Sequence, residues 1–245
     1  MIAFQDMILL VMAPFVGSFL GVLAYRLPLE LSVVVGRSVC DGCQRVLRPL
    51  QLLPVFGYYV QKGRCETCET RIPALYPGLE LAAFGMALWA VTVTDGAVTW
   101  ISCALGWALL TLAAIDMRHF WLPDVLTLPL LLCGLATTYW LQPEALNAAL
   151  LGAALGYAAF RLIGWGYALM RGQEGLGQGD AKLFAAAGAW LGWAALPAVL
   201  LWAALGGLAF MLAMQWDRGN ALPFGPFLAM GIWITWLYGP LEVMP

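Results

Sequence analysis

Long apolar stretches, separated by short polar turns, run through most of this chain. A helix of about 17–25 apolar residues is long enough to cross the roughly 30 Å of hydrocarbon in a bilayer. We place such stretches at residues 7–25, 75–94, 97–115, 122–141, 146–169, 182–194, 197–215 and 225–240, of which the sixth is short. The turns between them carry Gly, Pro, Asp or Asn. The pattern predicts an all-α polytopic membrane protein with about eight transmembrane helices.

Composition supports a membrane protein. Hydrophobic residues make up 62% of the chain and charged residues 11%, whereas soluble domains are roughly one-quarter charged. The first apolar stretch has neither a basic segment before it nor a small-residue cleavage site after it, so we interpret it as a retained helix and not as a signal peptide. Small residues recur in the later stretches and predict close helix packing in lipid; they are concentrated at 152–156, 185–189 and 203–207.

Basic residues predict the orientation, because loops on the cytoplasmic side of a membrane are enriched in Lys and Arg. All Lys and Arg residues except Arg161 lie in or beside alternate loops, at 26–74, 116–121, 170–181 and 216–224. The opposite segments, near 95–96, 142–145, 195–196 and 241–245, contain none. We therefore expect both termini outside. Acidic residues are mixed among the basic ones of the first loop, so nothing indicates a nucleic-acid partner.

The first inside loop, residues 26–74, carries two C-x-x-C pairs. Cys40 and Cys43 form the first pair and Cys65 and Cys68 the second, with 21 residues between the pairs. This spacing is typical of a tetrahedral four-thiolate zinc site, which leaves no position open for catalysis and is therefore structural. Two disulfides are the first alternative, and a reducing compartment disfavours them. Four ordinary buried cysteines are the second.

Two aspartates lie at ends of apolar stretches on the predicted cytoplasmic side. Asp116 ends the third stretch and Asp180 opens the sixth, 64 residues later. Two carboxylates in contact share a proton, so that the ionised one can accept a proton from water while the protonated one polarises an amide carbonyl. Glycines before Asp180, including Gly177 and Gly179, allow the loop to place it, and Lys182 follows. Alternatively, Asp180 only caps a helix and Asp116 only pairs with Arg118.

Several motifs together resemble the bacterial type IV prepilin peptidases, a family of membrane aspartic peptidases with a Gly-x-Gly-Asp motif. They are Gly17-Ser18-Phe19-Leu20-Gly21-Val22 with Arg26-Leu27-Pro28, the two C-x-x-C pairs, Tyr76-Pro77-Gly78-Leu79-Glu80-Leu81, the Asp116 segment, Glu174 to Leu183, and Pro223-Phe224-Gly225-Pro226-Phe227-Leu228. The resemblance covers nearly the whole chain, with the motifs in the family's order.

The resemblance implies a bifunctional enzyme of the bacterial inner membrane. Members cleave the leader of prepilins and pseudopilins at the cytoplasmic face, and then methylate the new N-terminal residue with S-adenosylmethionine. Asp116 and Asp180 match the catalytic aspartates, and the four cysteines match a zinc-binding, methylation-associated domain. The resemblance thus implies a first transmembrane helix at 1–25, the zinc domain at 26–74 and a seven-helix peptidase domain at 75–245. Asp124 and Glu174 are candidate contacts for the basic leader.

Three positions depart from the family pattern. Gly21 replaces the usual Asn, Leu52-Leu53-Pro54 stands where Asn-Ile-Pro is usual, and Leu75 replaces a basic residue. All three lie in the methylation-associated part, so a peptidase without methyltransferase activity is an alternative. A membrane scaffold whose zinc loop docks partners is another. A proton-coupled transporter is disfavoured, because its carboxylates would lie near the middle of the bilayer.

Overall fold

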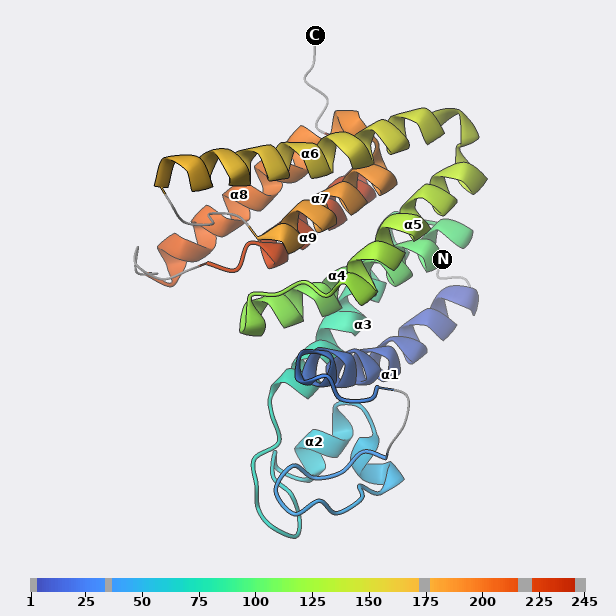
Figure 1. Ribbon diagram of the computed structural model, residues 1–245. Coiled ribbons are helices and arrows are strands. Elements are labelled where there is room, and N and C mark those ends of the chain that lie inside the picture. Colours follow the sequence, from blue (N-terminus) through green and yellow to red (C-terminus); the bar gives the residue numbers. More distant parts are fainter. Residues whose placement is uncertain (1–3, 34–36, 172–176, 216–221, 241–245) are drawn as a thin grey trace. The chain divides into compact units, whose positions relative to one another are not determined.

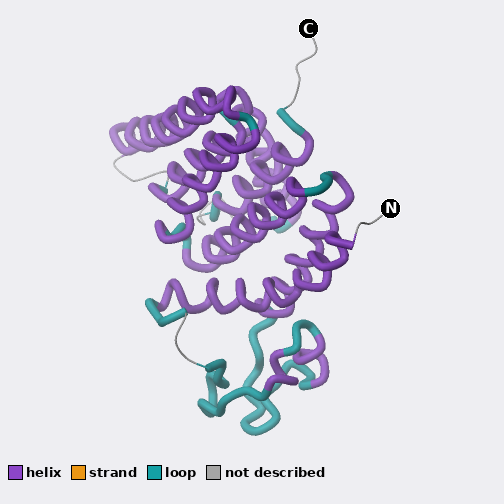
Figure 2. The backbone as a smooth tube through the Cα atoms, turned by 90° about the vertical axis from the view of Figure 1, so that its right-hand side faces the viewer, coloured by secondary structure: helices purple, strands orange, loops and turns teal. Residues whose placement is uncertain are grey.

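The computed structural model describes residues 4–33, 37–171, 177–215 and 222–240. These residues are helical or lie in turns and loops, and the only β-type pairing among them is two isolated bridges (Figure 2). Every expected apolar stretch coincides with a helix, labelled in Figure 1: α1 (Phe4–Arg26), α3 (Leu75–Val93), α4 (Ala97–His119), α5 (Asp124–Leu141), α6 (Leu146–Arg171), α7 (Gln178–Leu191), α8 (Leu196–Ala213) and α9 (Gly225–Tyr238). The short helix α2 (Phe56–Val60) lies in the cysteine loop. Single 3₁₀ turns occupy Leu27–Leu29, Pro49–Leu52, Pro143–Ala145 and Trp193–Ala195.

Six of these helices are long and apolar enough to cross a membrane, namely α1, α3, α4, α5, α6 and α8. The protein is therefore a multi-pass membrane protein with an all-α fold. Helices α7 and α9 have 14 residues each, which at 1.5 Å per residue is about 21 Å and shorter than the hydrocarbon core. The expected count of eight spans thus stays a prediction.

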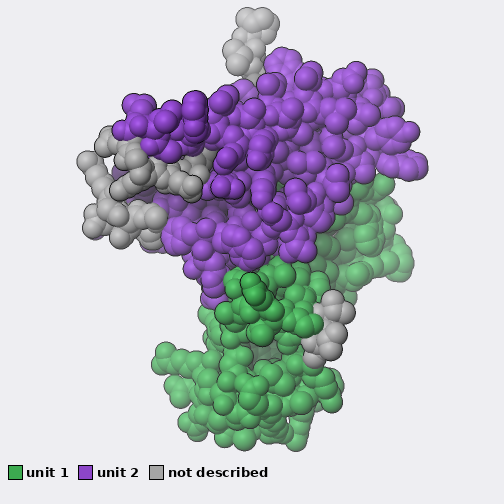
Figure 3. Space-filling view, viewed as in Figure 1, with its two compact units in different colours: residues 1–111 green, residues 112–245 purple. Residues whose placement is uncertain are grey.

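The chain forms two compact units, residues 1–111 and 112–245 (Figure 3). In the first unit α1 packs along α3, and the cysteine loop connects the two helices. Gly17 marks the close approach, since a Cβ there would lie 2.6 Å from the Cα of Glu80. The expected domains, with boundaries after residues 25 and 74, divide the chain by function and not by compactness. They stay a prediction.

Helix α7 is the centre of the second unit, where it packs against α5, α6 and α9. Its residues from Leu183 to Trp190 are all buried. Contacts with the surrounding helices therefore stabilise this short apolar helix. Gly188 of α7 meets Gly152 of α6, and a Cβ on Gly188 would lie 2.2 Å from the carbonyl oxygen of Gly152. The close packing expected from the small residues at 152–156 and 185–189 is therefore confirmed.

Candidate active site and metal centre

Asp116 is a buried carboxylate near the end of α4. Its exposed fraction is 5%, and its Oδ2 accepts a hydrogen bond of 2.9 Å from the backbone N–H of Gly225, the first residue of α9. The amino end of a helix carries free N–H groups and a partial positive charge, both of which favour a carboxylate. The structure thus holds Asp116 against a segment 109 residues further along the chain.

Gly225 is a residue whose part in the site the sequence analysis missed. A Cβ at this position would lie 2.7 Å from Asp116 Oδ2, so that only glycine allows the backbone to approach the carboxylate. Its motif, Pro223-Phe224-Gly225-Pro226, entered the sequence analysis only through family resemblance. A glycine followed by a proline at the start of an apolar stretch was the available signal, because proline is common in the first turn of a helix.

Asp180 lies in the first turn of α7 and is partly buried. Burial, together with the nearby charge of Asp116, raises the pKa of Asp180 to about 7, while a hydrogen bond from the Gly177 backbone opposes the rise. The charge of Asp116 thus contributes to the raised pKa of Asp180, and the expected pairing of the two aspartates stays a prediction. Asp180 is therefore about half protonated near pH 7 and mostly protonated below it.

The two glycines before Asp180 have steric roles as well. A Cβ on Gly177 would lie 3.1 Å from Asp180 Oδ2, and a Cβ on Gly179 would lie 2.8 Å from the Cβ of Leu122. Larger residues would therefore push against the carboxylate or against the segment that leads into α5. Glu174, the other residue predicted in this loop, lies outside the described residues.

Lys182 and Asp124 form an ion pair across two helices. The Lys182 Nζ lies 2.5 Å from Asp124 Oδ1, with side-chain exposed fractions of 27% and 57%. Asp124 is the first residue of α5, and its carboxylate faces a lysine of α7. A partly exposed pair contributes on the order of 0.2–1 kcal/mol to stability, so its main effect is to fix the start of α5 beside the turn that carries Asp180.

The four cysteines of the loop converge on one point. Their sulfur atoms all lie within 4.8 Å of one another, with 3.6 Å between Cys40 and Cys68 and 4.0 Å between Cys43 and Cys65. Bonded sulfurs would lie about 2.05 Å apart, so the thiols are free. A tetrahedral zinc with bonds of about 2.3 Å requires sulfurs about 3.8 Å apart. The donor set therefore fits a metal ion.

Both C-x-x-C pairs adopt the same turn. The amide of Gln44 donates to the Cys40 carbonyl at 2.9 Å, and the amide of Glu69 donates to the Cys65 carbonyl at 3.0 Å. Gln44 and Glu69 have matching positive φ angles of 56° and 57°. The loop thus consists of two equivalent knuckles, which direct their thiols to one centre, as the spacing predicts.

Hydrogen bonds favour the thiolate, the form that binds a metal, at two of the four cysteines. A side-chain hydrogen bond with Thr70 lowers the pKa of Cys68 to about 6. Backbone N–H groups, first that of Cys68 and then that of Thr67, lower the pKa of Cys65. At Cys43 the backbone N–H of Arg45 lowers the pKa, but hydrogen bonds with the neighbouring thiols, that of Cys68 first, together with burial raise it to about 11.

Two family models match this chain. The model described as the bacterial peptidase A24 N-terminal domain matches residues 11–94, which include the four cysteines. The model described as the type IV leader peptidase family matches residues 103–212, which include both aspartates. No solved structure matches the chain.

Curated relatives cover most of the chain. A protein of Burkholderia pseudomallei (strain 1026b) is 41% identical over 91% of this chain and 82% of its own length. A protein of Aeromonas salmonicida (strain A449) is 37% identical over 91% and 87%, and one of Pseudomonas aeruginosa is 35% identical over 91% and 87%. Each of these relatives is named a prepilin leader peptidase/N-methyltransferase.

Proposed function

This chain belongs to the type IV leader peptidase family, and we propose that it removes the leader of type IV prepilins or pseudopilins and then methylates the new N-terminal residue. As a member of this family it is a peptidase. The observation that carries the proposal is the similarity to prepilin leader peptidase/N-methyltransferases, which extends over 91% of the chain. The name of these relatives covers both activities, leader cleavage and methylation.

Asp116 and Asp180 are the proposed catalytic pair. The hydrogen bond from Gly225 to Asp116 supports Asp116 as the ionised member, and the pKa of about 7 supports Asp180 as the protonated one. Gly177, Gly179 and Lys182 position Asp180. The arrangement suits peptide hydrolysis by a water molecule, because one group accepts its proton while the other polarises the carbonyl.

The two aspartates hold one proton between them at the start and at the end of the proposed reaction. Asp116 accepts a proton from the attacking water, whose oxygen bonds to the scissile carbonyl carbon. Asp180 donates its proton to the carbonyl oxygen as the tetrahedral intermediate forms. When the C–N bond breaks, Asp116 passes its proton to the leaving amine and Asp180 recovers its own from the hydroxyl group. The products are a carboxyl group and an amine, and the pair returns to its first state.

The proposed location of the reaction is the cytoplasmic face of the bacterial inner membrane, with both termini in the periplasm. The distribution of Lys and Arg supports this orientation. A prepilin keeps an apolar helix in the bilayer and a basic leader in the cytoplasm, so its scissile bond reaches the level of the aspartates. Asp124 and Glu174 are proposed contacts of the leader. Since Asp124 pairs with Lys182, a basic leader residue would have to replace that lysine.

The proposed cofactors are a structural zinc ion and S-adenosylmethionine. Zinc held by Cys40, Cys43, Cys65 and Cys68 would have four thiolate ligands and no open position, so it supplies folding energy to the loop and no chemistry. S-adenosylmethionine supplies the methyl group. We assign methylation to the zinc domain at 26–74, together with the first helix, and peptide hydrolysis to residues 75–245.

Intact mass spectrometry of a prepilin incubated with the purified enzyme tests both activities, because leader loss and one added methyl group are separately visible. We expect Asp116→Asn and Asp180→Asn each to lower the rate of leader removal by about 10²–10⁴-fold, the usual contribution of a positioned acid or base. Asp95→Asn is the matched control, since Asp95 is exposed in the turn between α3 and α4. Full cleavage by both single variants would refute the pair.

A peptidase without methyltransferase activity is the second candidate. The observation that favours it is Gly21, which stands where the family usually has Asn. Gly21 packs against Tyr76, since a Cβ at this position would lie 2.8 Å from the Tyr76 ring. The same mass measurement separates the two candidates, because this one predicts leader loss with no added methyl group in the presence of S-adenosylmethionine.

A further inference from the structure

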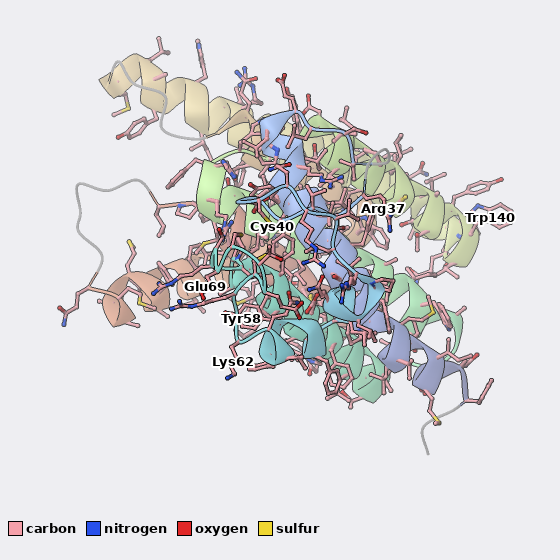
Figure 4. The ribbon with its side chains drawn as sticks, turned by 90° about the horizontal axis from the view of Figure 1, so that it is seen from below. Arg37, Cys40, Tyr58, Lys62, Glu69 and Trp140 are labelled. Atoms are coloured by element: carbon pink, nitrogen blue, oxygen red, sulfur yellow. The ribbon has the colours of Figure 1, made fainter. Side chains whose placement is uncertain are left out.

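The first compact unit contains a cavity of about 410 Å³ between the cysteine loop and the facing ends of α1 and α3. Its volume lies within the range of about 300–1,000 Å³ that is usual for small-molecule sites. The loop that forms one wall faces the viewer in Figure 4, where Cys40 and Tyr58 are labelled. Cys40 and Cys65 line the cavity, so a metal ion bound by the cysteines would hold this wall in shape.

A buried glutamate that forms no ion pair among the described residues lies in the wall of the cavity. Glu80 of α3 has an exposed fraction of 6%. Its Oε2 accepts a hydrogen bond of 2.6 Å from the backbone N–H of Val55, and the Ser18 hydroxyl is a second donor. Among the residues that the structure describes, no lysine or arginine forms an ion pair with Glu80. A buried acidic group without an ion-pair partner can accept a cationic ligand, which would supply the missing charge.

Aromatic and basic groups complete the wall. Tyr25 and Tyr76 lie with ring centroids 6.4 Å apart, and Tyr58 lines the cavity from the loop. Tyrosine faces attract cations and stack on flat heterocycles. Arg26 and Arg71 also line the cavity, and an arginine is the preferred partner of a carboxylate.

We propose that this cavity binds S-adenosylmethionine, with Glu80 as the counter-charge of its cationic part. The inference rests on the methyltransferase half of the proposed function. The ligand has a sulfonium and an ammonium group for Glu80 and the tyrosines, an adenine ring for an aromatic face, and a carboxylate for Arg26 or Arg71. The anionic headgroup of a lipid could pair with Arg26 or Arg71 but offers no positive group to Glu80, so it fits this lining less well.

Equilibrium binding of radiolabelled S-adenosylmethionine to the full-length zinc-loaded enzyme tests the proposal. Glu80→Gln keeps an acceptor for the Val55 N–H and removes only the charge. We expect it to weaken binding at least tenfold, while zinc content and leader cleavage are retained. Glu144→Gln is the matched control, since Glu144 is exposed in the turn before α6, and it should bind as the unaltered enzyme does.

Ultraviolet cross-linking of the same ligand gives a second readout that does not depend on a variant. We expect the label in peptides that contain Tyr58 or Tyr76. Label confined to residues 112–245, or unchanged binding by Glu80→Gln, would overturn the site. A Glu80→Gln enzyme that binds the ligand normally but cleaves prepilin with a raised KM would also overturn it, because the cavity would then hold the leader.

Failure of this site is distinguishable from failure of the proposed function. An unaltered enzyme that methylates prepilin, together with a Glu80→Gln variant that binds the ligand equally well, refutes only the site. An unaltered enzyme that cleaves prepilin, adds no methyl group and binds no S-adenosylmethionine refutes the methyltransferase function and the site with it.

Discussion

At the scale of single residues, two carboxylates of the second unit have different surroundings. Asp116 receives the N–H of Gly225 at the start of α9, whereas the charge of Asp116 is one of the causes that raise the pKa of Asp180. Both aspartates could be predicted as candidate site residues from the sequence, because each lies at the end or the start of an apolar stretch. The sequence could not show which aspartate is the acid and which the base. That assignment depends on the backbone N–H of Gly225, which lies 109 residues away from Asp116 along the chain.

A pH dependence follows from Asp180. Its raised pKa of about 7 means that the carboxyl group is protonated below pH 7 and loses its proton as the pH rises. If Asp180 is the acid, kcat/KM for leader removal should fall about tenfold per pH unit above the pKa. Initial rates between pH 5.5 and 9, with a stability check at each pH, measure this. A flat profile up to pH 9 would contradict the assigned roles.

At the scale of elements, the crossing of α6 and α7 depends on glycine. A Cβ on Gly152 would lie 2.6 Å from the carbonyl oxygen of Gly188, whereas a Cβ on Gly166, in the same helix, would meet nothing within 4 Å. We expect Gly152→Ala to destabilise the protein by about 1–3 kcal/mol, because the backbones must separate. Gly166→Ala, the matched control, should leave the melting temperature unchanged or raise it. Thermal unfolding of the purified enzyme measures both, and equal melting temperatures would show that this crossing is not tight.

The cysteine loop is an element that we expect to require its metal. Cys68→Ser should lower the zinc content, loosen residues 26–74 and abolish methylation, because two knuckles without a shared ion have little else to hold them. Leader cleavage should persist, since both aspartates lie in the other unit. Cys133→Ser is the control, because Cys133 lies in α5 outside the cluster. Metal analysis, limited proteolysis and the mass measurement report the three effects, and full methylation by a zinc-free enzyme would contradict this division of labour.

At the scale of the whole molecule, we predict that α7 and α9 both cross the bilayer. The distribution of Lys and Arg predicts that they do, although each has only 14 residues. A cysteine introduced at Ala194, in the exposed turn after α7, should react with a membrane-impermeant maleimide on intact cells. The unaltered enzyme is the control. Labelling of the variant only after permeabilisation would place that turn inside and reduce the number of spans.

The sequence by itself determined the elements and the residues that carry chemistry. Apolar length and the spacing of cysteines are local properties, so the helices and the four-thiolate cluster could be predicted without coordinates. Only the tertiary structure decided the contacts between distant segments. Gly225 against Asp116, Lys182 against Asp124, and Glu80 in the wall of a cavity all result from helix packing. That packing depends on side-chain shape across many elements, which no local pattern along the chain encodes.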